Sequence, residues 1–350
     1  MSSSIPCSSN SPSLPTKFQN FGAPFAASDA DIIVRSSDGY DFRVHRVILG
    51  LASVAFKDMF SMVQQHPVLA EQNDELSDDF KDGLPVVCLT EPSSTLFTLF
   101  KLIYPGDPPT ISGRSHTISV IRAMDKYLIE DYPNTITAAL LNLSEKSPHV
   151  VLGLAFRHHI AKEVRVEAAH FTLKSHAILS SSALSDEDLE LLTAAQYRRI
   201  LVYHRDCSQA ALSALAKPDW AKKPWAQASC GKEKQGVAKW GDSPSGCICI
   251  RSSHKIEVPG PLPSGQVRKR HIYVPEWTSH FISRCEAVAR DTPHWNIVSN
   301  VSIRSSAAKA DSCDMCASRA SEELDNLAAY FAKHIRRSIE QNYLQIELPV

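Results

Sequence analysis

The sequence lacks an excess of either charge, because 37 Lys and Arg residues are balanced by 38 Asp and Glu residues. The resulting net charge of −1 gives no broad electrostatic attraction to nucleic acid or to an acidic membrane. Long apolar runs are also missing, since no window approaches the roughly 18 uninterrupted apolar residues of a membrane span. We therefore expect neither nucleic acid nor a membrane among the partners of this chain.

A secretory signal is missing as well. The first residues, MSSSIPCSSNSPSLPT, have neither a basic n-region nor an apolar h-region. Without export, the nine cysteines are expected to be reduced thiols, in the cytoplasm or the nucleus. The Ser and Pro content of this segment predicts a disordered tail over residues 1–27.

The common motifs of catalysis are absent. There is no P-loop, no G-x-S-x-G and no H-E-x-x-H. His204-Arg205-Asp206 copies the catalytic tripeptide of protein kinases, but Ala211 stands where a kinase needs Asn. No Asp-Phe-Gly motif and no Gly-rich loop accompany the tripeptide, so we interpret it as part of a helix. The sequence thus predicts that the chain is not an enzyme.

The most informative patterns of the sequence lie in residues 29–60. Residues 32–34 form a short β-rich run, and residues 40–44 alternate apolar and polar side chains with the period of a half-buried strand. Between these runs, Asp38-Gly39 tolerates the positive φ angles of a primed turn. This stretch is therefore predicted to begin with a β-hairpin.

Two helices are expected after the hairpin. Val47, Ile48 and Leu51 recur at helical spacing and form an apolar stripe on the first helix. Ser53 is placed to cap the second helix. The apolar stripe of the second helix follows the spacing i, i+3 and i+4 and consists of Phe56, Met59 and Phe60.

The ordered motifs of this stretch resemble the opening of a BTB/POZ domain of the fungal type. From Asp31 to Phe60 the chain reads D-I-x-V, then G-x-x-F-x-V-H-R-x-I-L, then S-x-x-F-x-x-M-F. Weaker matches continue through the next strand and two helices, at residues 86–89, 95–104 and 120–127. The resemblance covers about residues 28–145. It implies an α+β module, a short β-sheet flanked by α-helices, followed by a mostly helical region.

The resemblance also implies protein–protein interaction. BTB-like proteins act as scaffolds or adaptors, and many are substrate receptors for cullin ubiquitin ligases. Asp31 and His45 match residues near the dimer cleft of the family, although His45 is equally suited to bridging backbone where strand meets helix. The matching cullin-contacting surface is expected around Met59, Phe60 and Met62. Other proteins, including a second copy of the chain or a cullin scaffold, are the expected partners.

An alternative function is a homodimeric transcriptional or chromatin-associated regulator. It would use the basic cluster Arg268-Lys269-Arg270-His271, which equally suits a solvated loop. Cys and His pairs at zinc-finger spacing are missing, however. Homodimers of the family often use a strand before the first hairpin, and residues 17–27 show little strand pattern.

The rest of the chain divides by composition. Residues 64–83 are acidic and are expected to form a mobile surface loop. Residues 146–217 are predicted to be helical, with one long helix over 189–215 after a cap at Ser185. Residues 218–274, rich in Pro, Gly and Trp, predict a loop or linker, and residues 275–350 are predicted to be helical again.

Cys313-Asp-Met-Cys316 is the one candidate for a metal site. Cysteines at i and i+3 near a helix start can share a zinc ion. Four residues are candidates to complete the ligands: Cys247, Cys249, Cys230 and His254. Cys247 and Cys249 point to opposite sides of an extended chain, so two ordinary thiols on a helical turn are the alternative. No cofactor is required by the sequence; a structural zinc ion, or less readily a thiol- or metal-dependent activity, would depend on this pair.

Overall fold

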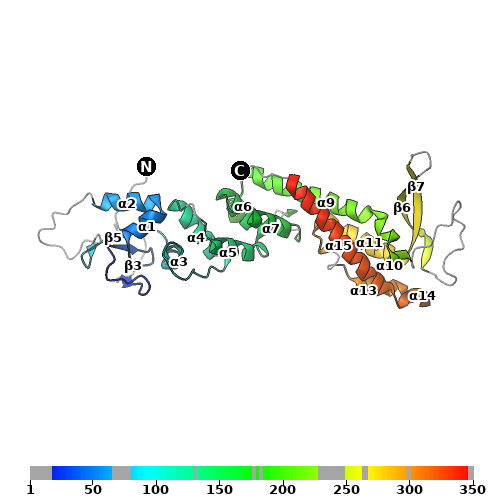
Figure 1. Cartoon of the computed structure of the whole chain (residues 1–350), viewed down its shortest axis with the longest axis horizontal. Coiled ribbons are helices and arrows are strands. Elements are labelled where there is room, and N and C mark those ends of the chain that lie inside the picture. Colours follow the sequence, from blue (N-terminus) through cyan, green and yellow to red (C-terminus); the bar gives the residue numbers. More distant parts are fainter. Residues whose placement is uncertain are drawn as a thin grey trace. The chain divides into compact units, whose positions relative to one another are not determined.

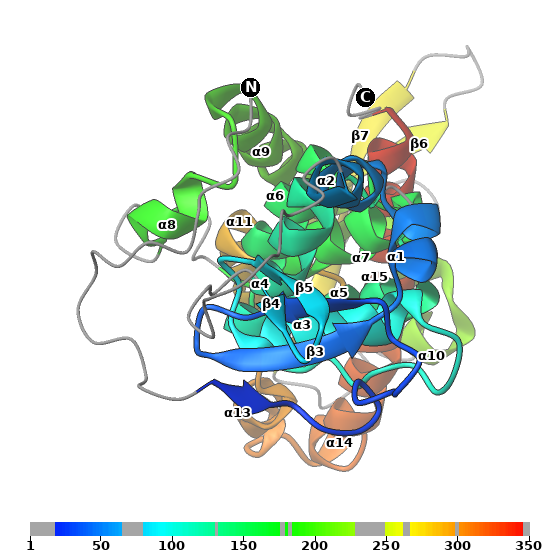
Figure 2. The same ribbon diagram turned by 90° about the vertical axis from the view of Figure 1, so that its left-hand side faces the viewer.

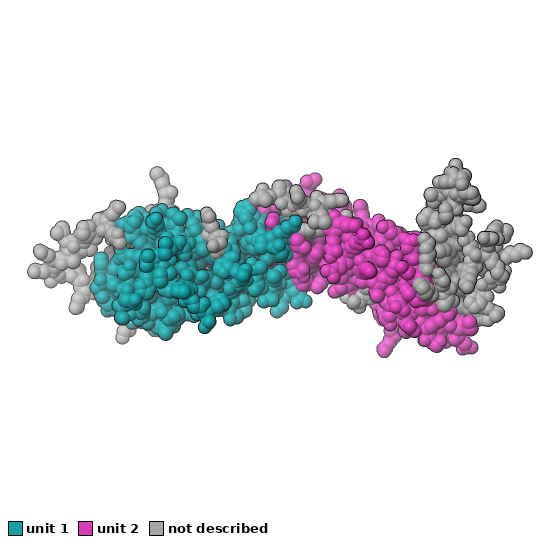
Figure 3. Space-filling view, in the orientation of Figure 1, with its two compact units in different colours: residues 1–147, 154–164 teal, residues 148–153, 165–350 magenta. Residues whose placement is uncertain are grey.

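The structure is a computed structural model that describes residues 18–64, 80–129, 132–175, 179–180, 184–227, 249–261, 267–297 and 301–345. The chain divides into two compact units (Figure 3). Unit 1 consists of residues 1–147 and 154–164, and unit 2 of residues 148–153 and 165–350. The fold is mixed α+β, as the sequence predicts, and most described elements are helices (Figure 1). Within the described residues, every helix is too short or too polar to span a bilayer.

In the described part of unit 1, five strands form one curled sheet (Figure 2). The strands are β1 (Gln19–Asn20), β2 (Ile32–Arg35), β3 (Tyr40–Val44), β4 (Phe80–Lys81) and β5 (Leu84–Cys88). Their order is β1-β3-β2-β5-β4, with β2 antiparallel to β3 and parallel to β5. Ile32 pairs with Val44, so the hairpin predicted from alternation is present, and Phe42 and Val44 are buried as that pattern requires.

The helices described in unit 1 include α1 (Arg46–Ala52), α2 (Val54–Gln64), α3 (Ser93–Ile103), α4 (Arg114–Lys126) and α5 (Asn134–Ser144). Residues of α6 (Pro148–Arg157) and α7 (Lys162–Thr172) belong partly to each unit. Ser53 caps α2 as predicted, because its Oγ accepts a hydrogen bond of 3.0 Å from the amide of Phe56. The same hydroxyl donates to the carbonyl of Tyr127, which joins α2 to the end of α4.

The turn of the β2–β3 hairpin differs from the expected primed turn. Gly39 has a φ of 86°, whereas Asp38 has no positive φ. The amide of Ser36 donates to the carbonyl of Tyr40 at 2.9 Å, so three residues form the loop, as in a turn that ends in a left-handed glycine. The Asp38 carboxylate instead accepts from the amide and hydroxyl of Ser93, at 2.8 and 2.7 Å, and so caps α3.

Gly39→Ala should destabilise unit 1 by about 1–2 kcal/mol, because a side chain at positive φ crowds its own carbonyl. Gly50→Ala is the matched control. Gly50 is helical, its nearest neighbour to an added Cβ is Lys57 at 3.5 Å, and the change should be neutral or stabilising. Hydrogen exchange of unit 1 peptides in a urea titration measures both. Equal stability of the two variants would contradict the turn assignment.

Residues 18–27 are not a disordered tail, which corrects that prediction for the described part of the segment. β1 runs parallel to β3, with Gln19 opposite Tyr40. Phe21 stacks on Phe42 with ring centroids 4.3 Å apart, and Phe25 lies edge-on to Phe100 at 5.7 Å. The segment therefore completes both the sheet and the aromatic core of unit 1.

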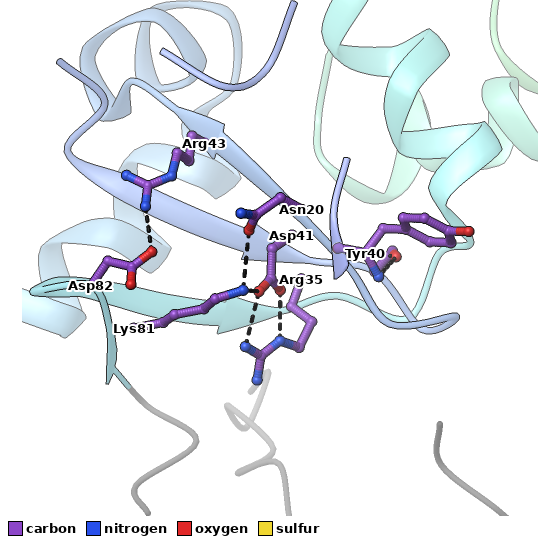
Figure 4. A network of polar contacts seen from close by, with 8 residues as sticks. Asn20, Arg35, Tyr40, Asp41, Arg43, Lys81 and Asp82 are labelled. Atoms are coloured by element: carbon purple, nitrogen blue, oxygen red, sulfur yellow. Dashed lines mark hydrogen bonds and ion pairs between the residues drawn. The ribbon is translucent and has the colours of Figure 1, made fainter. Parts of the chain in front are cut away.

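A polar network joins the edges of the curled sheet (Figure 4). Asp41 of β3 is fully buried. Its carboxylate accepts hydrogen bonds from Nε of Arg35 at 2.7 Å and from Nζ of Lys81 at 2.6 Å. Lys81, in the edge strand β4, also donates to Oδ1 of Asn20 in the opposite edge strand β1 at 3.1 Å. Asp41 thus holds two cations from two other strands.

Part of the predicted acidic loop is structured. Residues 65–79 lie outside the described residues. Residues 80–83 belong to a hairpin of β4 and β5, whose turn residues Asp82 and Gly83 have φ angles of 52° and 76°. These two positive φ angles are those of a primed turn, the type that the sequence predicted for Asp38-Gly39. Asp82 forms an ion pair with Arg43 of β3, at the surface of the sheet.

Unit 2 is mostly helical in its described part. Its elements after α7 are α8 (Asp186–Leu189), α9 (Ala194–Ala216), η2 (Pro218–Lys222), α10 (Pro224–Gln227), β6 (Ile250–Pro261), β7 (Val267–Pro275), α11 (Glu276–Asp291), α13 (Ile303–Ala307), η3 (Ala308–Ala310), α14 (Asp314–Ala317) and α15 (Ala320–Gln345). α9 packs against both α11 and α15. Trp277, Phe281 and Cys285 are buried on one face of α11, as their spacing predicts.

Two predictions for unit 2 are wrong in detail. Ser185 caps only α8, and the long helix begins later, after a second capping box at Thr193 and Gln196. Residues 218–274 are not a continuous loop, because β6 and β7 pair in an antiparallel hairpin. The basic cluster 268–271 therefore lies in β7, with Arg270 opposite Val258. His204-Arg205-Asp206 lies inside α9, as interpreted from the sequence.

Candidate metal centre and protein-binding residues

Three cysteines from two distant segments meet in unit 2. Cys249 lies immediately before β6, and its carbonyl accepts from the amide of Glu276, the first residue of α11, at 2.9 Å. The Glu276 carboxylate pairs with Lys309 of η3 at 3.4 Å, and η3 packs on α11. The turn after η3 thereby brings Cys313 and Cys316 to the start of α11, beside Cys249.

The cysteine cluster is buried and compact. The sulfur atoms of Cys249, Cys313 and Cys316 all lie within 4.8 Å of one another, and all three side chains are buried. Cys313 is the N-cap residue of α14, and its carbonyl accepts from the amide of Cys316 at 2.9 Å, so the turn fixes the spacing of the pair. Burial, and then the neighbouring thiols, raise the pKa of Cys249 above its ordinary value.

The cluster can hold a metal ion. In a tetrahedral site with zinc–sulfur bonds of about 2.3 Å, neighbouring sulfur atoms are about 3.8 Å apart. The three sulfur atoms here lie within 4.8 Å of one another, so a small contraction brings them to that distance. Of the predicted partners that lie within the described residues, Cys249 is the one that the structure brings to Cys313 and Cys316. Cys230 and Cys247 lie outside the described residues, and His254 lies further along β6. The sequence could not choose Cys249, because the pairing of β6 with the start of α11 is a tertiary contact.

The described cysteines are not all free thiols. Cys207 and Cys285 are buried and take part in no disulfide, and burial raises the pKa of each to about 12. Cys88 takes part in a disulfide, so the expectation of fully reduced cysteines is wrong for that residue.

Asp31 and His45 make contacts within their own chain. The Oδ1 atom of Asp31 accepts from the amide of Arg46 at 2.8 Å, so Asp31 caps α1. The amide of His45 donates to the hydroxyl of Tyr104 at 2.7 Å, and its ring Nδ1 lies 3.1 Å from the same oxygen. His45 therefore bridges the start of α1 to the end of α3, which is the structural role considered for it. Burial raises the pKa of Tyr104.

The three residues predicted to contact a cullin differ in accessibility. Phe60 is only 3% exposed and stacks on Phe56 at 5.7 Å, so it belongs to the core and cannot contact a partner in this fold. Met59 is half-buried, and Met62 is 52% exposed. The prediction failed for Phe60 because two faces of α2 carry apolar residues. The packing of Phe56 against Tyr127 and Phe100 shows that the face shared by Phe56 and Phe60 is the buried one.

The sequence missed an exposed apolar surface on α1 and α2. Val47, Leu51, Val54 and Met62 are 66%, 85%, 60% and 52% exposed, and we name these four residues the α1–α2 face. Val47 and Leu51 recur at the helical spacing noted in the sequence, and both are exposed, whereas Leu49 is the α1 residue that is fully buried. Four of the ten large hydrophobic side chains exposed in the described residues belong to this face.

A second cluster of titratable groups lies inside unit 2. His294 is buried, packs its ring 3.9 Å from that of Trp295, and accepts at Nδ1 from the amide of Asn296 at 3.1 Å. Burial, and then the nearby charges of Lys174, His170 and Arg336, lower the pKa of His294 to about 3. His294 is therefore neutral near pH 7.

Comparison of the chain with protein-family models and with curated proteins gives no match.

Proposed function

We propose that this chain is a protein-interaction adaptor without catalytic activity, whose BTB/POZ-like unit 1 binds a partner protein through the α1–α2 face. The observation that carries the proposal is the exposure of that face. Leu51 is 85% exposed and Val47 of the same helix is 66% exposed, while Leu49 between them is fully buried and anchors the helix to the core. Apolar patches rimmed by polar residues mark interaction sites in soluble proteins.

The arrangement of unit 1 supports the BTB/POZ-like part of the proposal. Three of the residues that carry the sequence resemblance have a structural role within unit 1. Asp31 caps α1, Gly39 closes the hairpin, and Ser53 caps α2. Together they hold α1 and α2 beside the sheet while leaving the α1–α2 face open.

The partner that we propose offers an apolar helix face. Val47 and Leu51 are one turn apart on α1, and Val54 and Met62 follow the i±4 row of α2, the ridges that helices present to one another. A cullin scaffold is the sharper version of this partner, and the BTB/POZ resemblance suggests it. It would be contacted through the α1–α2 face together with Met59, because Phe60 is buried.

Leu51→Glu should weaken binding of the purified full chain to the purified N-terminal region of a cullin at least tenfold, or about 1.4 kcal/mol, because it places a charge in an apolar contact. Leu128→Glu is the matched control: Leu128 is also in unit 1 and is 56% exposed, but it lies outside the face. Isothermal titration calorimetry measures both variants, and circular dichroism checks that each is folded.

Two outcomes would decide against parts of this proposal. Equal binding by both variants would show that the α1–α2 face is not the binding surface. No cullin binding, together with self-association in analytical ultracentrifugation that Leu51→Glu abolishes, would make the partner a second copy and end the ligase version.

We also propose that unit 2 holds a structural zinc ion at the cysteine cluster. Three thiolates suit zinc or another soft metal ion, and burial of all three is typical of a structural site. Zinc prefers four ligands, so a fourth ligand joins the three described cysteines. The ion would add no reaction to the chain, in keeping with an adaptor.

A further inference from the structure

We propose that the metal ion bound by Cys249, Cys313 and Cys316 holds the base of the β6–β7 hairpin against the helices of unit 2, so that the hairpin is ordered only in the metal-bound protein. This inference rests on the proposed zinc site and adds a segment of the chain that the ion controls. It follows from where the three ligands lie and from the irregular strand pairing at the base of the hairpin.

The three ligands come from two parts of unit 2, the start of the β6–β7 hairpin and the turn at α14. Cys249 precedes the first residue of β6, while Cys313 and Cys316 belong to the turn at α14. One ion bound to all three sulfur atoms is a cross-link between the start of the hairpin and the helical part of unit 2. Because the sulfur atoms already lie within 4.8 Å of one another, the cross-link needs only a small local contraction.

The base of the hairpin has little pairing of its own. Ile250 pairs with Pro275, and the register then shifts before regular pairing resumes at Lys255 and Tyr273. Proline has no amide hydrogen, so this first pair is weak. In the described residues the sheet has only β6 and β7, and a two-stranded hairpin is marginally stable by itself in water. An added constraint at the base therefore has a large effect on the order of both strands.

Without the ion the cluster is a poor constraint. Thiols are weak hydrogen-bond donors and acceptors, so contacts among three thiols hold the start of the hairpin only weakly. Metal binding replaces three protons by one divalent cation, forms three metal–sulfur bonds and releases the protons to solvent. The energy of those bonds is available only when Cys249 stays beside α14, which couples metal binding to the position of the hairpin.

The test compares metal-free and zinc-loaded full-length protein. The chain is stripped with a chelator under reducing conditions, divided, and one half is reloaded with one equivalent of Zn²⁺. Hydrogen exchange followed by mass spectrometry should show at least tenfold slower exchange in peptides covering residues 250–275 of the zinc-loaded protein. Peptides of unit 1 should exchange equally in both samples and serve as the internal reference.

Variants make the test specific. Cys316→Ser should bind less than stoichiometric zinc and should lose the zinc-dependent protection of residues 250–275. Cys285→Ala is the matched control, because Cys285 is a buried free thiol of unit 2 outside the cluster, and it should keep both properties. If Cys316→Ser misfolds, as unit 2 peptides would reveal, Cys249→Ser provides the same comparison from the other segment.

The outcomes separate this inference from the zinc proposal. Absence of bound zinc by elemental analysis of the reloaded wild-type protein would overturn both. One zinc ion per chain that Cys316→Ser removes, with unchanged exchange in residues 250–275, would overturn only the control of the hairpin. Stoichiometric zinc with slower exchange confined to that segment would establish the inference.

Discussion

Replacing Asp41 with Asn should lower the free energy of unfolding of unit 1 by about 3–5 kcal/mol, the usual cost of removing one partner from a buried ion pair. Asp41 is fully buried, and the Arg35 side chain that it binds is also buried. Asn keeps the shape and one acceptor but removes the negative charge that two cations share. The positive charge of Arg35 would then remain in the interior, where desolvation is not offset.

Asp82→Asn is the matched control for this prediction. Asp82 also pairs with an arginine across the sheet, Arg43, but its side chain is 53% exposed. Exposed pairs contribute about 0–1 kcal/mol, and Asn tolerates the positive φ of this position as well as Asp does. The two variants therefore change the same atoms in a buried and in an exposed pair of one sheet.

The measurement must report on unit 1. All five Trp residues of the chain lie in unit 2, so their fluorescence does not follow the unfolding of unit 1 directly. Hydrogen exchange of peptides from β2 and β3 across a urea titration gives the free energy of opening of the sheet. A loss below 1 kcal/mol for Asp41→Asn would show that the network of Figure 4 does not hold the sheet together.

The sequence predicted the local parts of unit 1 well because their information is local. Alternation of apolar and polar residues in 40–44 specifies a strand with one buried face, and Gly39 specifies where the chain turns. β1 was missed because two residues carry no periodicity, and Gln19 pairs with Tyr40 from a distant part of the sequence. Parallel pairing of this kind has no signature within the short strand itself.

The same distinction holds for the candidate sites. The spacing of Cys313 and Cys316 showed that these two thiols share a helical turn, and the structure places them so. The third thiol, Cys249, was one of four candidate ligands, and among the described residues the structure selects it by bringing its sulfur within 4.8 Å of the other two. The helical spacing of Val47 and Leu51 identified a face of α1, but spacing does not tell whether a face turns to the core or to solvent.

The hairpin of unit 2 was missed for a chemical reason. Proline and glycine at 259–261 favour loops, and in the structure they occupy the end of β6, opposite the basic cluster of β7. A strand end tolerates proline when no regular strand lies on its other side. Composition alone therefore predicted a linker where two strands pair.

Acidification should destabilise unit 2 through His294. Burial lowers the pKa of His294 to about 3, whereas in the unfolded chain the imidazole titrates near 6.5. Above about pH 6.5 both states are neutral at this residue, so it adds no pH dependence. Below that pH the imidazole of His294 is protonated in the unfolded state but stays neutral in the folded state. The free energy of unfolding therefore falls by about 1.4 kcal/mol per pH unit until the pKa of the folded state is reached. At pH 4.5 the loss from His294 alone is about 3 kcal/mol.

His294→Asn should remove this part of the pH dependence. Asn cannot be protonated, and its side-chain oxygen can still accept from the amide of Asn296, the partner of Nδ1 in the wild type. Burial also lowers the pKa of His170, so that residue contributes with the same sign and remains in the variant. The expected result is a shallower fall in stability between pH 7 and pH 4.5, not its abolition.

Tryptophan fluorescence during urea unfolding reports the unfolding of unit 2 and so tests this prediction, because Trp295 packs on His294 and every Trp lies in unit 2. The free energy of unfolding is measured for wild type and His294→Asn at both pH values, and the two differences are compared. Carboxylates that titrate in this range contribute equally to both proteins and cancel. Equal losses in the two proteins would show that His294 is protonated in the folded state, and would place its imidazole in contact with water instead of in the core of unit 2.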